Sequence, residues 1–155
     1  MPEFSLRSAR PSDLPRVLAL LAERKLAPNH IEQQFGSQYA VAETAAGELV
    51  GVAGVERYAG DGLFRSAAVS ERFAGRGIGE TLTRNRLSWA RHEGLRSLYL
   101  LTETAAEYWP RFGFVRIERA SAPDAILGSP EWAGGCPASA VAMRLDLGAP
   151  VGAPA

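Results

Sequence analysis

The first half of the chain alternates apolar and polar positions with a period of two, apart from one segment with helical spacing. An apolar stripe at helical spacing predicts an amphipathic helix that Ser12 can cap, and its members are Leu14, Val17, Leu18 and Leu21. A shorter helix is expected from Asn29 to Phe35. The alternating segments predict strands over residues 4–7, 39–44, 48–58 and 63–69, with turns at Ala46-Gly47 and Asp61-Gly62.

The second half changes to strands separated by helices. A glycine-rich loop leads into a helix that ends near Glu93, with Gly94 placed as its C-terminal cap. The apolar run of residues 98–101 predicts a strand covered on both faces. A short helix from Thr104 to Arg111 and strands over residues 114–118 and 141–147 follow. Hairpins followed by crossovers predict an α/β fold with a mixed, mostly antiparallel sheet.

Composition and charge restrict the classes of protein. The 155 residues fit one domain, expected over residues 1–147, with residues 148–155 as a disordered tail. Seventeen basic residues balance seventeen acidic ones, which argues against nucleic-acid binding. The sequence has neither an apolar run that could cross a bilayer nor a signal-peptide pattern, and its one cysteine, Cys136, cannot form an internal disulfide. We therefore expect a cytoplasmic protein that binds neither membrane nor nucleic acid.

The loop after the strand that ends at Val69 carries the chemistry. Its glycines permit close backbone approach, and free N–H groups at the start of the following helix form an anion site. Arg72 and Arg76 flank this site and supply positive charge. A P-loop is excluded because Glu80-Thr81 follows the last glycine, and a dinucleotide-binding turn because the spacing is G-x-G-x-G after antiparallel hairpins. A glycine-rich turn without a ligand stays open as the alternative.

Two motifs resemble those of the GNAT acetyltransferases. Arg72-x-x-Gly75-x-Gly77 is similar to their acyl-CoA pyrophosphate motif, and the segment 108–114 is similar to their x-Y-x-x-x-G-F helix-to-strand segment. The resemblance implies a GNAT fold, with six to seven strands flanked by about four helices, and an N-acetyltransferase that uses acetyl-CoA as cosubstrate and no metal. It also implies cofactor contacts from Ala68, Val69, Arg72, Gly75, Arg76, Gly77, Ile78, Gly79 and Thr104.

A narrower resemblance concerns the acceptor. The segment 101–109 resembles N-acetylglutamate synthase domains and, still more closely, the short GNAT proteins associated with arsenic-resistance operons. Those proteins also resemble this chain at residues 63–66, 129–132 and 136–140. The resemblance implies that a small-molecule amine accepts the acetyl group, an amino acid or an amino-acid analogue, in arsenic or antimetabolite detoxification. The alternation from Val141 to Leu147 is compatible with the homodimers that many relatives form.

The same resemblance implies the catalytic groups. The backbone N–H of Val69 is the expected oxyanion donor. Many GNAT enzymes carry a tyrosine acid four residues before the Gly-Phe pair, where this chain has Trp109. The neighbouring Tyr108, or water, is therefore left to protonate the departing thiolate. Glu103 or an ordered water chain is expected to act as base.

An acidic acceptor needs fixed positive charge, preferably from arginine. Arg65 is the first candidate, Arg57 is the second, and Lys25 lies where family members often line the acceptor cleft. Two other functions stay open. One is a peptide or protein N-acetyltransferase, and the other is a non-catalytic acyl-CoA-binding sensor, which Trp109 in the acid position would suit.

Overall fold

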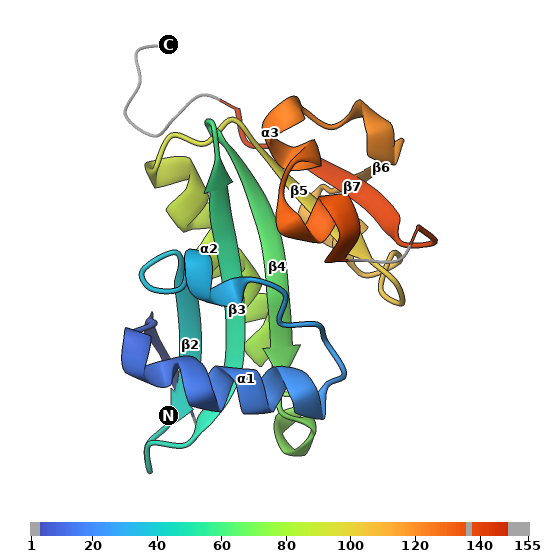
Figure 1. Ribbon diagram of the computed structural model, residues 1–155. Coiled ribbons are helices and arrows are strands. Elements are labelled where there is room, and N and C mark those ends of the chain that lie inside the picture. The colour runs from blue at the N-terminus through green and yellow to red at the C-terminus, as the bar shows by residue number, and fades with distance from the viewer. Residues whose placement is uncertain (1–3, 136–137, 149–155) are drawn as a thin grey trace.

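The computed structural model describes residues 4–135 and 138–148, and their centre is a seven-stranded sheet (Figure 1). The strands lie in the order β1-β2-β3-β4-β5-β7-β6, and every neighbouring pair is antiparallel except β4 and β5. Their bounds are Phe4–Ser8 (β1), Tyr39–Thr44 (β2), Leu49–Tyr58 (β3), Asp61–Val69 (β4), Ser97–Thr102 (β5), Val115–Ile117 (β6) and Val141–Asp146 (β7). The sheet confirms the expected mixed, mostly antiparallel α/β fold.

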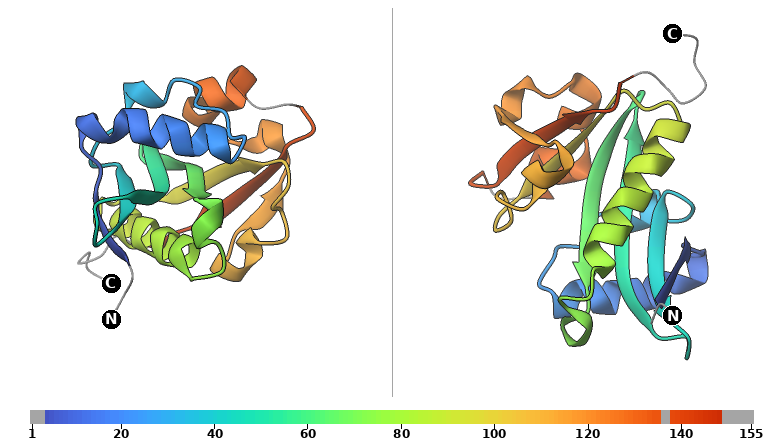
Figure 2. Two further views of the ribbon diagram at one scale, coloured as in Figure 1. Left: turned by 90° about the horizontal axis from the view of Figure 1, so that it is seen from below. Right: turned by 180° about the vertical axis from the view of Figure 1, so that it is seen from behind.

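Helices cover both faces of this sheet. The two long ones are α1 (Leu14–Glu23) and α2 (Ile78–His92). On one face α1 lies together with the one-turn helix α3 (Asp124–Leu127), and α2 lies on the opposite face (Figure 1, Figure 2). Short helical turns complete the described chain, at Pro11–Asp13, Ile31–Gln33, Glu71–Phe73, Trp109–Phe112, Arg119–Ser121 and the π-helical Glu131–Gly135.

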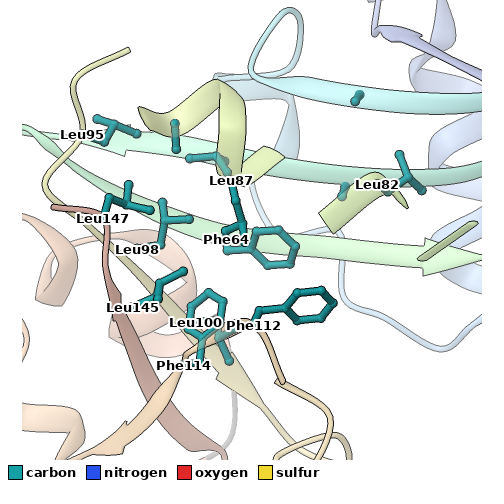
Figure 3. Packing of buried hydrophobic residues seen from close by; sticks show 14 of the residues in the cluster. Phe64, Leu82, Leu87, Leu95, Leu98, Leu100, Phe112, Phe114, Leu145 and Leu147 are labelled. Atoms are coloured by element: carbon teal, nitrogen blue, oxygen red, sulfur yellow. The ribbon is translucent and has the colours of Figure 1, made fainter. Parts of the chain in front are cut away.

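Each face of the sheet buries its own apolar side chains. The cluster under α2 joins the helix to β4, β5 and β7 and includes Phe64, Leu82, Leu87, Leu98, Leu100 and Leu145 (Figure 3). Under α1, Val17, Leu20 and Leu21 pack with Val52 and Ala68. Burying one such aliphatic side chain stabilises the fold by roughly 1.5–3 kcal/mol. Both long helices are therefore held firmly against β3 and β4.

The helix α1 differs from the expectation in its start and in its buried stripe. The buried carboxylate of Asp13 accepts the backbone N–H of Arg10 at 2.7 Å, so Ser12 is not the residue that organises the helix start. Leu18 was expected on the apolar stripe but is exposed, and Leu20 is buried in its place. The end of α2 follows the expectation, because Gly94 has a φ of 77° there.

Two expected helices are shorter in the structure. His30 has a φ of 54°, which confines the first of them to Ile31–Gln33. The second is a turn over Trp109–Phe112, because Pro110 has no N–H to donate to the carbonyl of an α-helix. The short helices between residues 119 and 135 were not expected, since their few apolar residues show no period.

The hairpin turn before β4 lies two residues earlier than expected. Ala59 and Gly60 have φ angles of 55° and 98°, and Asp61 already belongs to the strand. Asp61 pairs with Tyr58 across the hairpin, so the turn is a two-residue connection.

The C-terminal strand β7 is an interior strand of the sheet. It pairs with β5 on one side and with β6 on the other, which explains the alternation from Val141 onward without a second copy of the chain. A homodimer stays a prediction. Cys136 and the greater part of the expected tail, residues 149–155, lie outside the described residues. Within the part of the chain that the structure describes, no helix is long and apolar enough to cross a membrane.

Candidate functional site

The two parallel strands of the sheet separate along their length. β4 and β5 pair only through Gly62 and Leu63, at the beginning of β4. Further along, β4 carries a bulge around Ser66, where its register against β3 shifts and φ is 58°. A bulge bends a strand and increases its twist. β4 therefore turns away from β5 (Figure 1), which opens the sheet between them.

A cavity of about 210 Å³ lies where the strands separate. Three parts of the chain line it: the strands β3 and β4, the first turns of α2, and the segment after β5. The lining residues are Val52, Ala67, Ala68, Val69, Gly79, Leu82, Thr83, Tyr108 and Trp109. Most of these side chains are apolar, and the hydroxyl of Thr83 already donates to Gly79 O at 2.8 Å. Such a lining suits a narrow, largely aliphatic ligand with few polar groups.

The loop between β4 and α2 presents backbone N–H groups beside this cavity. Gly75 and Gly77 both have a φ of 79°, and a Cβ atom at either position would meet nothing within 4 Å. They are needed for backbone conformation and not for space. The N–H of Thr81 bonds to Gly77 O at 3.0 Å, so the N–H groups of Ile78 and Gly79 precede the first intrahelical donor. With the helix dipole behind them, these groups form an anion site.

Arginines flank the loop, as the motif predicts. The Cζ atoms of Arg72 and Arg76 lie 5.4 and 5.0 Å from the ring centre of Phe73. Arg72 also forms an ion pair with Glu48 of the β2–β3 turn, and 66% of its side chain is exposed. A phosphate group on the loop would therefore compete with Glu48 for this guanidinium.

Tyr108 brings a hydroxyl to the start of α2. A Cβ atom at Gly79 would lie 3.9 Å from Tyr108 Oη and 3.6 Å from a methyl group of Val69. Burial raises the pKa of the Tyr108 phenol, which keeps it protonated at neutral pH. Trp109 packs instead against Phe64, with ring centres 5.1 Å apart. Of the two aromatic residues, Tyr108 is thus the one whose polar atom lies at the start of α2, beside the cavity.

Arg65 lies in a buried polar cluster on the α1 face of the sheet. Its Nη1 donates to Asn29 O at 2.7 Å, and its Nε donates to Ser66 Oγ at 3.2 Å. The carboxylates of Glu56 and Glu131 lie 3.6 and 3.7 Å from the guanidinium. The cluster contains two carboxyl groups for one arginine. Burial raises the pKa of Glu131 to about 7, although Arg65 acts in the opposite direction.

Two tyrosines complete this cluster around Glu56. Tyr39 Oη donates to Glu56 Oε2 at 2.6 Å, and Tyr58 Oη donates to Glu56 Oε1 at 3.0 Å. Burial, reinforced by the Glu56 carboxylate, raises the pKa of both phenols, so they remain donors. Glu56 therefore accepts hydrogen bonds from two phenols, and Arg65 is held between segments that are distant in sequence.

Arg57 lies near the end of α2, away from the cavity. It forms an ion pair with Glu93 just beyond the end of α2, and its Cζ lies 5.6 Å from the ring centre of Trp89. Arg57 pairs with Gly62 at the beginning of β4, whereas the cavity lies at the end of that strand. Arg57 is therefore placed away from the cavity, and its contact with the acceptor stays a prediction.

The remaining predicted residues lie at the surface. Lys25 is exposed directly after α1, where its φ of 58° and the bond from its N–H to Ala22 O end the helix. Glu103 and Thr104 are exposed in the turn after β5, and neither is among the residues that line the cavity.

Sequence reasoning missed several residues of the site. Leu82 and Thr83 stand three and four positions after Gly79, so helical spacing from that glycine was a signal that could have found them. Glu131 gave no such signal, since its segment has no regular pattern. Glu23, whose carboxylate accepts the N–H of Glu71 at the start of the loop, gave none either.

Comparison with protein families identifies this architecture. The family model described as an acetyltransferase (GNAT) domain matches residues 35–116, which is more than half of the chain. The chain belongs to the GNAT acetyltransferases. The matched model describes an acetyltransferase domain. Comparison with curated protein sequences gives no match.

Solved structures show the same fold over almost the whole GNAT chain. N-acetylglutamate synthase from Neisseria gonorrhoeae, solved with coenzyme A and N-acetyl-glutamate, matches with a TM-score of 0.79 and 23% identity over 95% of this chain. The match covers only 36% of the synthase, so this chain spans about a third of that protein. Rv2747 from Mycobacterium tuberculosis, in complex with CoA and NLQ, matches with a TM-score of 0.75 and 23% identity over 92% of this chain and 98% of its own.

An enzyme whose name gives a protein as its acceptor shares the fold as well. The ribosomal-protein-S18-alanine N-acetyltransferase from Escherichia coli matches with a TM-score of 0.69 and 15% identity, over 93% of this chain and 94% of its own. The fold alone therefore does not distinguish acceptors. No group of three or more histidine, cysteine or acidic residues among those described is arranged to hold a metal ion.

Proposed function

We propose that this GNAT protein transfers the acetyl group of acetyl-CoA to the amine of a small molecule, an amino acid or an amino-acid analogue. The observation that carries the proposal is the segment after α1, which the buried Arg65 holds through Ala27 and Asn29 and which carries the exposed cation Lys25. The likeness to N-acetylglutamate synthase, which was solved with coenzyme A and N-acetyl-glutamate, extends over 95% of this chain and supports an amino-acid acceptor.

The donor half of the proposal follows the cavity and the loop. The pantetheine arm of acetyl-CoA runs through the apolar gap between β4 and β5, and the pyrophosphate rests on the N–H groups at the start of α2. The proposed contacts are those of the motif: Ala68, Val69, Arg72, Gly75, Arg76, Gly77, Ile78 and Gly79, with Thr104 from the turn after β5.

The chemistry needs few side chains. The neutral amine attacks the thioester carbonyl, the oxyanion accepts the N–H of Val69, and the carbon–sulfur bond then breaks to release the CoA thiolate. Tyr108 is the proposed proton donor to this thiolate, because its phenol lies beside Val69 and Gly79 at the cavity. Glu103, exposed after β5, is the proposed acceptor of the amine proton, directly or through ordered water.

For acceptor binding, we propose different roles for Arg65 and Lys25. Arg65 bonds to the carbonyl oxygens of Ala27 and Asn29 at 3.4 and 2.7 Å, so it fixes the segment that follows α1. Lys25 belongs to that segment and is exposed. We assign the acceptor carboxylate to Lys25 at the surface, and to Arg65 the positioning of the segment that carries it.

Acetyl-CoA-dependent release of free thiol across a panel of amines tests the proposal. The panel holds glutamate, aspartate, methionine, glutamate analogues with phosphinate or arsinate groups, and short peptides with alanine at the N-terminus. Turnover of free amino acids without turnover of peptides is expected. Selective turnover of the arsinate or phosphinate analogues would extend the proposal to detoxification. Turnover of peptides alone would overturn it, and silence across the panel with CoA binding intact would favour a sensor.

A further inference from the structure

Two exposed arginines stand over neighbouring aromatic rings next to the cavity. The Cζ of Arg111 lies 4.2 Å from the ring centre of Tyr108, and the Cζ of Arg84 lies 5.3 Å from that of Phe112. The two rings are themselves 5.5 Å apart, centre to centre. One arginine comes from α2 and the other from the turn after β5, so the pair brackets the opening between these elements.

Both guanidinium groups are held in place without being buried. Stacking on an aromatic face fixes the plane of a guanidinium and leaves its N–H edge for other partners. Arg111 is further fixed by the bond from its Nε to Tyr108 O at 3.0 Å. Arg84 keeps a loose ion pair with Glu80 at 3.7 Å, and 62% of its side chain is exposed. Two neighbouring rings thus carry two oriented cations, and Glu80 pairs loosely with one of them.

We propose that Arg84 and Arg111 bind the 3′-phosphate on the ribose of coenzyme A. This inference rests on the proposed placement of the pyrophosphate at the first turn of α2. Arg84 stands six residues after Ile78, about 9 Å along the helix, which is within reach of the nucleotide end of the same ligand. A phosphate monoester carries more negative charge than either single phosphate of a pyrophosphate diester, and it accepts two-point bonds from guanidinium groups. The 3′-phosphate is the one phosphate of CoA that the glycine-rich loop leaves without a partner.

Binding of CoA and of 3′-dephospho-CoA tests this subsite directly. Isothermal titration calorimetry of the whole chain is expected to show CoA binding at least tenfold more tightly than 3′-dephospho-CoA. The double variant Arg84→Gln/Arg111→Gln is expected to bring this ratio close to one, by weakening CoA alone. Arg91→Gln is the matched control, because it lies seven residues after Arg84 on the same side of α2, about 10 Å farther from the cavity. It should keep the wild-type ratio.

The outcomes separate the subsite from the donor site. Equal binding of the two ligands by the wild-type chain, or a ratio that survives the double variant, would overturn the subsite and leave the donor site intact. Binding of neither ligand by the wild-type chain would overturn both placements together. Gly77→Glu, which puts bulk and negative charge at the pyrophosphate, should weaken CoA and 3′-dephospho-CoA equally, because it acts on the part that they share.

Discussion

The carboxylate of Glu23 accepts the backbone N–H of Glu71, with Oε2 2.9 Å from the nitrogen. The same oxygen lies 3.3 Å from the hydroxyl of Ser70, which is buried. Glu23 is the last residue of α1, and Glu71 opens the loop that leads from β4 to α2. A helix on one face of the sheet therefore fixes the start of the loop that serves the helix on the other face.

Removing this carboxylate should weaken CoA binding without unfolding the chain. Glu23→Ala leaves the N–H of Glu71 without its acceptor, a change comparable to the loss of a helix cap, which costs about 0.5–2 kcal/mol. We expect the dissociation constant for CoA to rise roughly 3- to 30-fold, as measured by calorimetry. Glu23→Gln keeps an acceptor oxygen and should restore most of the affinity. Equal binding by all three proteins would show that the loop holds its shape unaided.

The hydroxyl of Tyr108 should matter for turnover and not for binding. Tyr108→Phe keeps the ring beneath Arg111 and removes the proposed acid. General acid catalysis typically contributes about 10²–10⁴-fold. We expect kcat to fall about 100-fold, with the KM for acetyl-CoA unchanged within about twofold.

Steady-state kinetics on the amine found by the panel measures this effect. The CoA dissociation constant of the same variant serves as the control for an intact cavity. A kcat within twofold of the wild-type value would assign protonation of the thiolate to water. The raised pKa of Tyr108 adds a second condition, since an acid that stays protonated above neutral pH predicts no loss of kcat between pH 7 and 9 from this group.

The order of the elements and the cofactor loop were predictable because their signals are local. Alternation with period two marks strands such as β7, and helical spacing marks α1, whatever the rest of the chain does. Gly75 and Gly77 indicate a backbone with positive φ, which residues with a Cβ atom rarely adopt. Each of these signals lies within a few neighbouring residues, so the sequence alone is enough to predict the strand, helix or loop that it marks.

The acceptor side was not predictable in the same way. Arg65 was expected as a ligand, but its bonds run to Asn29 O and to carboxylates on β3 and on the segment after α3. Such contacts depend on which segments the fold brings together. The ion pair of Arg57 with Glu93 was not predictable for the same reason, since position on a strand does not say which end of the neighbouring helix a residue will contact. Pro110 carried a local signal against the helix expected around it.

The buried carboxylate of Asp13 should contribute strongly to stability. It accepts bonds from Arg7 at 2.8 and 2.9 Å and from Arg16 at 2.9 Å, and it is 1% exposed. Asp13→Asn removes the negative charge that Arg7 and Arg16 share, and hydrogen bonds to charged groups contribute about 1.5–3 kcal/mol. We expect urea unfolding to show a loss of about 2 kcal/mol. Glu43→Gln, at the more exposed end of the network, should cost less than about 1 kcal/mol.

The same network predicts the direction of acid sensitivity. The Arg7 guanidinium holds the pKa of Asp13 well below its usual range. The unfolded chain binds a proton at Asp13 at a higher pH than the folded chain does, so the stabilisation is complete above the ordinary carboxyl pKa and is lost as pH falls below it. Wild-type stability should therefore drop below pH 4 by more than that of Asp13→Asn. If the stabilities of the wild type and of Asp13→Asn fell in parallel below pH 4, the proposed effect of Asp13 would be contradicted.

Glu131 should make stability depend on pH in the opposite sense, because its pKa is raised by burial to about 7. Between the unfolded carboxyl pKa and pH 7, the folded chain holds a proton that the unfolded chain has released. Folding stability therefore falls as pH rises through this window and is constant on either side of it. The groups that act on Glu131 are Arg65, Glu56 and Arg119, and only the two arginines oppose the shift.

Glu131→Gln removes this titration while keeping the shape of the side chain. We expect the variant to gain stability relative to the wild type by on the order of 2 kcal/mol between pH 5 and pH 8, since each unit of pKa shift corresponds to about 1.4 kcal/mol. Urea unfolding at pH 5, 6, 7 and 8 measures the difference, and Glu107→Gln, at an exposed position, is the control that should show none. Profiles of Glu131→Gln and wild type that run parallel would mean that Glu131 stays ionised in the folded chain. Arg65 would then be paired with two charged carboxylates, and the segment that it holds at Ala27 and Asn29 would be no weaker at pH 8 than at pH 5.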